Sequence, residues 1–154
     1  MTDSRPILFI IGILMSTLAL AMCLPAVADA AVQNPDWKVF ALASAFTLLI
    51  GVMLMLTARS PTRTLNQRQA FVLTSLSWTM IPAFGALPFA FSELELSYTD
   101  AFFEAMSGIT TTGSTVLTGL DFAPPGILLW RALLQWLGGI GILAMAIGLL
   151  PLLQ

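Results

Sequence analysis

The stretch SGITTTGSTVLTG, residues 107–119, interrupts a chain that is otherwise strongly apolar. Its polar core runs from Thr110 to Thr115 and is broken by Gly113. Threonine is β-branched and favours extended backbone, whereas glycine adopts φ values that other residues resist. The stretch therefore predicts non-helical backbone, and the apolar sequence on either side of it must explain where that backbone lies.

The composition is that of a membrane protein. Of the 154 residues, 58% are hydrophobic and 9% are charged, and the mean hydropathy is +0.92. Soluble domains carry about 25% charged residues. The chain has no histidine and one cysteine, Cys23. This composition excludes histidine-based catalysis, histidine metal sites and an intrachain disulfide, and we predict that the protein is not an enzyme.

Four uncharged segments are long enough to cross a bilayer, because about 20 helical residues span a hydrocarbon core of ~30 Å. The four segments are Pro6–Ala28, Val39–Ala58, Gln69–Ser92 and Ala132–Gln154. The sequence predicts an all-α polytopic membrane protein with four transmembrane helices. The first segment has a second interpretation, because Leu24–Ala31 (LPAVADAA) also resembles a signal-peptide cleavage site.

Charged residues in the connections predict the orientation. The loop at 58–69 contains basic residues and no acid, and the positive-inside bias places it in the cytoplasm, together with the N-terminus and Gln154. Residues 29–36 and 92–126 contain acids and no base, and we place both on the outer side. The charged residues concerned are Arg59, Arg63 and Arg68 inside, and Asp29, Asp36, Glu93, Glu95, Asp100, Glu104 and Asp121 outside.

The connection between the third and fourth segments begins with a predicted short helix, Tyr98–Ile109. Ser97 and Asp100 fit a capping box, although Thr99 or Asp100 would also serve as the N-cap, and Gly108 is a plausible stop. A helix of this length covers about 15 Å, half a bilayer, so the chain must return to the side it came from. We therefore expect a re-entrant pore helix followed by a filter loop.

Non-helical backbone survives at membrane depth only where protein buries it or where it lines a wet cavity. Carbonyl groups of such a loop can replace the hydration shell of a cation, and the partially negative end of the preceding helix favours positive charge. Two other interpretations remain open from the residues alone. The loop can be an ordinary polar surface loop, or an anion-binding nest, although neither Lys nor Arg lies close to it in the sequence.

Two charged residues and four glycines have more than one interpretation. Glu104 either supports the filter region or belongs to a solvated helix start. Arg131 is expected to snorkel or to pair with an outer acid. The glycines of the last segment either allow close helix packing or make a flexible inner helix; they are Gly138, Gly139, Gly141 and Gly148.

Two longer stretches resemble a known family. Residues 100–116 (DAFFEAMSGITTTGSTV) and 131–151 (RALLQWLGGIGILAMAIGLLP) are similar to the Trk/Ktr/HKT superfamily of potassium transporters, and to its TrkH type in particular. In that family, four repeats of helix, pore loop and helix surround one ion path, and two extra helices precede them in the TrkH type. The resemblance implies that residues 1–68 hold the two leading helices with the cytoplasmic arginine loop, and that residues 69–154 form the first repeat.

The resemblance also implies the site. Gly113 corresponds to the filter glycine of the first repeat, and a serine at this position accompanies sodium preference in plant relatives, so Gly113 favours potassium. The flanking residues would contribute carbonyl or hydroxyl oxygens, and Glu104 would support them. The implied filter is Thr110, Thr111, Thr112, Gly113 and Ser114, with potassium held through Thr111, Thr112 and Gly113.

The expected function is potassium uptake across the bacterial inner membrane, without a covalent cofactor. Family subunits are much longer, so we expect an N-terminal piece whose partners are the remaining repeats of its subunit; assembly of several copies around an axis is the alternative. The resemblance further implies a homodimer, a cytosolic nucleotide-binding regulatory subunit and membrane lipid, with no nucleic acid. The alternative function is a non-transporting membrane scaffold in which residues 110–115 form an external loop.

Overall fold

The computed structural model describes residues 4–58 and 65–149, and every regular element in that part of the chain is a helix. The predicted all-helical class is therefore confirmed. The elements are α1 (Arg5–Ala31), α2 (Trp37–Thr57), α3 (Gln67–Gly85), α4 (Leu87–Phe91), α5 (Tyr98–Ile109), the 3₁₀ helix η1 (Leu120–Phe122) and α6 (Pro125–Leu149).

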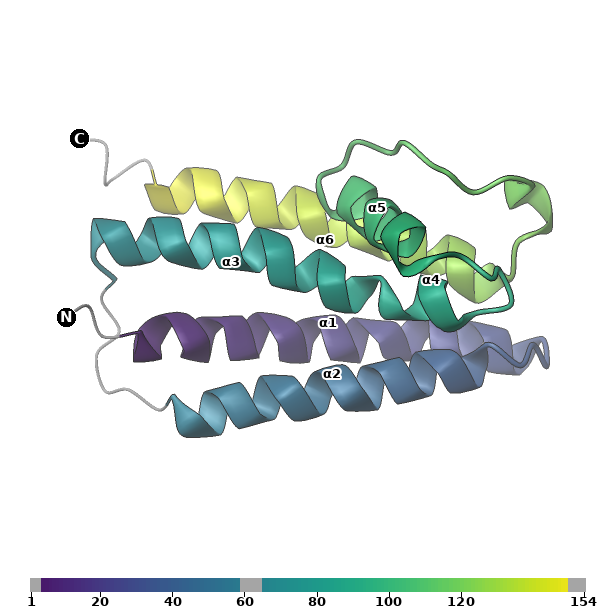
Figure 1. Ribbon diagram of the computed structural model, residues 1–154, viewed down its shortest axis with the longest axis horizontal. Helices are drawn as coiled ribbons and strands as arrows, with labels where there is room; N and C mark the ends of the chain where they lie inside the picture. The colour runs from purple at the N-terminus through teal and green to yellow at the C-terminus, as the bar shows by residue number, and fades with distance from the viewer. Residues whose placement is uncertain (1–3, 59–64, 150–154) are drawn as a thin grey trace.

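The long helices lie side by side along one axis (Figure 1). α1 and α2 form an antiparallel pair, α1 also contacts α3 and α6, and the short α5 packs on α3, α4 and α6. Among the residues whose backbone and side chains the structure describes, three segments are long and apolar enough to cross a membrane: Arg5–Ala31, Trp37–Thr57 and Gln67–Phe91. The fourth predicted span, 132–154, extends outside the described residues, and α6 covers its described part.

Two predicted spans, the third and the fourth, differ from the observed helices in their bounds. The third span is divided at Ala86 into α3 and α4, because Pro88 has no N–H to donate to the preceding turn. α6 begins at Pro125 rather than at 132, so Arg131 lies inside the helix and not before it. Leu24–Ala31, the stretch that also fits a cleavage site, forms the last turns of α1.

Small residues let α1 and α2 approach closely. A Cβ placed on Gly12 would lie 2.7 Å from the carbonyl oxygen of Gly51. Further along the pair, the hydroxyl of Ser44 donates to the carbonyl of Ala19 at 2.7 Å. Close backbone contact and interhelical hydrogen bonds stabilise helix pairs in lipid, where the hydrophobic effect contributes little between helices.

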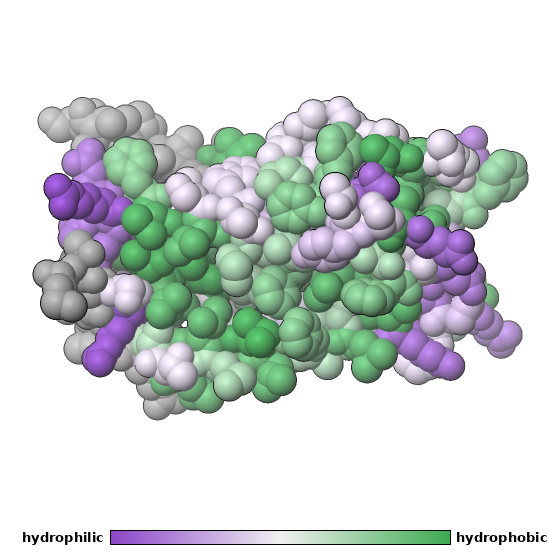
Figure 2. Space-filling view, in the orientation of Figure 1, coloured by the Kyte–Doolittle hydropathy of each residue, from purple (hydrophilic) through white to green (hydrophobic). Residues whose placement is uncertain are grey.

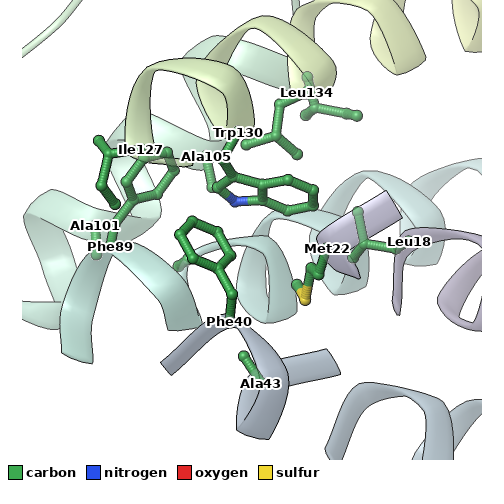
Figure 3. Close-up of a cluster of buried hydrophobic side chains, with 12 residues drawn as sticks. Leu18, Met22, Phe40, Ala43, Phe89, Ala101, Ala105, Ile127, Trp130 and Leu134 are labelled. Atoms are coloured by element: carbon green, nitrogen blue, oxygen red, sulfur yellow. The ribbon is translucent and has the colours of Figure 1, made fainter. Parts of the chain in front are cut away.

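A buried cluster around Trp130 joins the helix pair to the rest of the molecule (Figure 3). The Trp130 ring meets Phe40 edge to face, with centroids 6.3 Å apart and planes at 75°. Its indole N–H donates to the carbonyl of Gly85 at 2.9 Å, next to the break between α3 and α4. The cluster thus fixes α6 against α2 and α3.

Hydrophilic side chains gather at the two ends of the molecule and a hydrophobic band lies between them (Figure 2). Arg5 and Arg68 lie where α1 and α3 begin. Asp36 and Glu93 belong to connections at the opposite end of the helices. Arg59 and Arg63, which the orientation prediction also used, lie outside the described residues.

Candidate functional site

The predicted short helix is present as α5, with the predicted bounds Tyr98–Ile109. Ser97 is the N-cap: its hydroxyl accepts from the backbone N–H of Asp100 at 3.1 Å and donates to the Asp100 carboxylate at 2.7 Å. The acid also lies in the first turn, where it is favoured by the helix dipole. Neither Thr99 nor Asp100 is the cap, which settles the alternatives left open by the sequence.

The C-terminal end of α5 differs from the prediction. Gly108 does not end the helix; it is buried within it, and a Cβ there would lie 3.0 Å from the Leu134 side chain. The chain turns at Thr111, which has φ 58°. The N–H of Thr111 donates to the Gly108 carbonyl at 2.9 Å, and the N–H of Thr112 donates to the Ser107 carbonyl at 3.0 Å. This is a Schellman motif with a β-branched residue in the position that glycine usually takes.

After this turn the chain is irregular from Thr112 to Leu117 and has no helical or strand hydrogen bonding. Gly113 follows with φ 76°, and its N–H also donates to the Ser107 carbonyl, at 3.2 Å. The side chains from Thr111 to Val116 are exposed. In Figure 1, α5 lies obliquely in the same half of the molecule as α4, and the segment that follows it starts near the middle of the bundle and returns to the end where η1 lies.

Hydroxyl groups hold the first residues after α5 in place. Thr110 donates to the carbonyl of Met106 at 2.8 Å and lies 2.9 Å from the hydroxyl of Thr112. The buried hydroxyl of Ser107 donates to the carbonyl of Ser114 at 2.6 Å. The hydroxyls of Ser107, Thr110 and Thr112 are thus engaged within the loop and hold its backbone in place.

Glu104 lies behind the loop and ties it to two helices. Its carboxylate is buried, and one oxygen accepts from the Thr115 hydroxyl at 2.5 Å, the Val116 N–H at 2.6 Å and the Leu117 N–H at 3.3 Å. The other oxygen accepts from Nε of Arg131 on α6 at 3.1 Å. Both oxygens of this carboxylate therefore accept hydrogen bonds, and the guanidinium of Arg131 compensates its negative charge.

The burial of Glu104 does not fit a solvated helix start, and its hydrogen bonds tie it to the segment that follows α5. The structure also shows the predicted pairing of Arg131 with an outer acid. Arg131 is the one basic residue that follows Arg68 in the sequence, and this scarcity is a signal that could have identified the pair. Ser107 and Thr115, the other two anchors of the loop, carry no comparable signal, because serine and threonine are common throughout this region.

One stripe of α6 faces α5 and the loop. Its members, spaced three or four residues apart, are Arg131, Leu134, Gln135 and Gly138. Gly138 makes the closest approach: a Cβ there would lie within contact distance of the Ile109 carbonyl oxygen, carbon and Cα at once. The close-packing interpretation therefore holds for Gly138. Gly148 lies in the part of α6 whose side chains the structure does not describe.

Two buried carboxylates join the helix pair to the segment that carries the site, and we call them the carboxylate clamp. Asp29 accepts from the N–H of Gly126, in the first turn of α6, at 2.7 Å. Asp36 accepts from the N–H of Glu93 at 3.1 Å. Burial raises the pKa of Asp36, the Glu93 N–H lowers it, and the nearby charges of Glu93 and Asp29 raise it further. The sequence predicts both acids on the outer side, and nothing in it indicates that they are buried.

The chain is similar to known proteins in sequence and in fold. Residues 37–154 match the family model TrkH, described as a cation transport protein. The Trk system potassium uptake protein TrkH of Escherichia coli K12 is 41% identical over 150 residues, which are 97% of this chain and 31% of that protein. The Trk system potassium uptake protein TrkI of Halomonas elongata is also 41% identical, over 97% of this chain and 30% of its own length.

A solved structure is similar as well. The crystal structure of the potassium transporter TrkH from Vibrio parahaemolyticus matches with a TM-score of 0.92 and 36% sequence identity, over 97% of this chain and 32% of that one. The chain thus spans about a third of the length of the relatives it matches. On the family model and these relatives, the chain belongs to the TrkH family of cation transport proteins.

Proposed function

We propose that this chain takes part in potassium uptake across the bacterial inner membrane, as the portion of a Trk-type transporter that contributes one quarter of its selectivity filter. The observation that carries the proposal is the path of the chain after α5. The 12-residue helix α5 ends near the middle of the bundle, and an irregular, exposed loop leads from there back to the end of the bundle where η1 lies. Such backbone is tolerated at membrane depth where it lines an aqueous path.

Potassium would shed water and meet backbone carbonyls of Thr111, Thr112 and Gly113, with Thr110 and Ser114 flanking them. The hydrogen bonds of the Thr110 hydroxyl and of the Ser114 carbonyl within the loop favour backbone oxygens of the three middle residues as ligands. The C-terminal end of α5 adds a partial negative charge. A negative interior then drives the ion inward by about 2.3 kcal/mol per charge per 100 mV.

The proposed organisation follows the relatives. Residues 1–68 are the two leading helices and residues 69–154 are the first repeat, with the re-entrant α5 and its loop on the outer side. One loop cannot surround an ion, and relatives about three times as long support three further repeats as partners. The relatives are named as proteins of a Trk system, which supports an assembly of several components. A homodimer and a cytosolic nucleotide-binding regulatory subunit belong to the proposal.

The proposed orientation places the acidic end outside and the end with Arg5 and Arg68 in the cytoplasm, in accordance with the positive-inside bias. The apolar band between the two ends is the surface expected to face lipid (Figure 2).

The test is substitution of Gly113 by valine in the complete subunit, in cells that depend on it for potassium. A β-branched residue is strained at φ 76°, and its adjustment would displace the carbonyls on both sides. We expect uptake to fall by about tenfold or more, since a loss of ~1.4 kcal/mol in ion stabilisation is a factor of ten.

Gly119 provides the matched control. It has φ 69°, lies on the same connection and has open space around it, so Gly119→Val imposes similar strain away from the proposed filter. We expect this variant to retain uptake. Equal uptake by the Gly113 variant and the wild-type protein at equal membrane abundance would contradict the filter and would support the scaffold alternative.

A further inference from the structure

A cavity of about 440 Å³ lies between α1, α3 and α6 and is distinct from the filter loop. Its walls are mostly apolar, formed by leucine, isoleucine, tryptophan and glycine, together with the hydroxyl side chains of Thr17, Thr74 and Ser77. Its volume is within the range of about 300–1,000 Å³ that is typical of binding pockets. Ile109, the last residue of α5, also lines it.

The cavity lies at the middle of the helices that form it. Leu18 is the central residue of α1, Ser77 lies near the centre of Gln67–Phe91, and Gly138 lies next to the centre of α6. Since each helical residue advances about 1.5 Å, a cavity at these positions is close to the midplane of a bilayer that the helices cross. At that depth, the mobile apolar molecules that contact membrane helices are lipid acyl chains.

The lining offers few groups to a polar occupant. A buried water makes about three hydrogen bonds, and Thr17 already donates to the carbonyl of Ile13 at 3.0 Å. The buried hydroxyl of Ser77 has no hydrogen-bond partner. This one group cannot supply the hydrogen bonds that a cluster of waters filling the cavity would need. A dehydrated cation needs a shell of oxygen ligands, which these walls do not provide. The cavity is therefore not a continuation of the ion path.

We propose that this cavity binds the acyl chain of a membrane lipid, which packs beneath the end of α5. The contact has a structural consequence, because the carbonyl of Ile109 rests on Gly138 and both residues line the cavity. A bound chain fills the space under the turn from which the loop begins. The proposal does not depend on potassium transport, and its test measures lipid contact alone.

The experiment uses a phospholipid with a photoreactive diazirine near the end of one acyl chain, incorporated into membranes that contain the full-length protein. After illumination, mass spectrometry locates the labelled residues. We expect adducts on the cavity-facing residues of α3 and α6, including Ser77. Gly141 lines the cavity and has open space around it, so Gly141→Leu fills the cavity and should reduce that labelling several-fold.

Gly139→Leu is the matched control, since Gly139 is on the same helix, has open space around it and does not line the cavity. It should leave the labelling of α3 unchanged. Ser77→Leu is a second filling variant, and it also removes the unpartnered hydroxyl. The proposal is overturned if cavity residues of the wild-type protein stay unlabelled while lipid-facing residues of α2 are labelled, or if the Gly141 and Gly139 variants label alike.

Discussion

At the scale of single residues, Glu104 determines how the loop is held. Four donors converge on its buried carboxylate, three from the loop and one from Arg131. A charge of this kind stabilises the loop only while its partners remain, because removal of one member leaves the other buried and uncompensated.

Substitution of Glu104 by glutamine should therefore reduce stability by about 3–5 kcal/mol and disturb the loop, as is usual when one member of a buried ion pair is removed. The measurement is the thermal stability of the purified full-length protein, together with potassium uptake. The double variant Glu104→Gln with Arg131→Met should recover part of the loss, because no charge is then left unpaired. Strictly additive effects of the two substitutions would show that the pair is not coupled.

Thr111 shows why the backbone conformation of a single residue is hard to predict from sequence. A sequence pattern assigns left-handed backbone to glycine, and Gly108 and Gly113 both lie nearby. Gly108 instead lies within the helix, where Leu134 leaves little room for a side chain, and Thr111 takes the left-handed conformation with φ 58°. The identity of the turning residue depends on contacts with α6, which the local sequence does not contain.

At the scale of elements, the seam between α5 and α6 positions the loop. Gly138 lets the end of α5 lie directly on α6, since even a methyl group there would overlap the Ile109 backbone. The start of α5 was predictable from its cap, and its predicted bounds hold, but the predicted stop at Gly108 was wrong. The start of α6 was not predictable, because a rule that excludes charges from spans removes Arg131, whose partner Glu104 lies on another helix.

Gly138→Ala should consequently separate α5 from α6 and lower the melting temperature, with an overpacking penalty of about 1–3 kcal/mol. Potassium uptake should fall with it, because the loop begins at the displaced end of α5. Gly139→Ala is the neighbouring control, and it should be neutral or slightly stabilising, since nothing lies within 4 Å of its Cβ position and alanine favours helix. If both variants have the melting temperature of the wild-type protein, the contact between α5 and α6 does not require glycine at position 138.

At the scale of the whole molecule, the carboxylate clamp joins the helix pair to the segment that carries the site. The sequence predicted both parts from hydropathy, but not their connection, because Asp29 and Asp36 read as ordinary loop acids. Their hydrogen bonds reach Gly126 and Glu93, far along the chain, and only the packing of the helices reveals them.

The clamp predicts a pH dependence. The pKa of Asp36 is raised above its ordinary value of 3.8, so the folded protein binds a proton more readily than the unfolded chain. The corresponding stability is present below that value and is lost as the pH rises through the higher pKa of the folded state. Asp36→Asn keeps an acceptor for Glu93 and should flatten the dependence of melting temperature on pH in this window. A wild-type protein whose stability increases with pH there would contradict the assignment.

The hydrogen bonds that shape the loop come from a short part of the chain. Its cap, its turn and its buried acid lie between Ser97 and Leu117, and its contacts on α6 lie between Arg131 and Gly138. Once residue 138 has left the ribosome during synthesis, every group in this set is therefore available. Under the proposed function, this quarter of the filter can acquire its shape during synthesis, before the later repeats are made, and closure of the filter then requires the docking of finished parts.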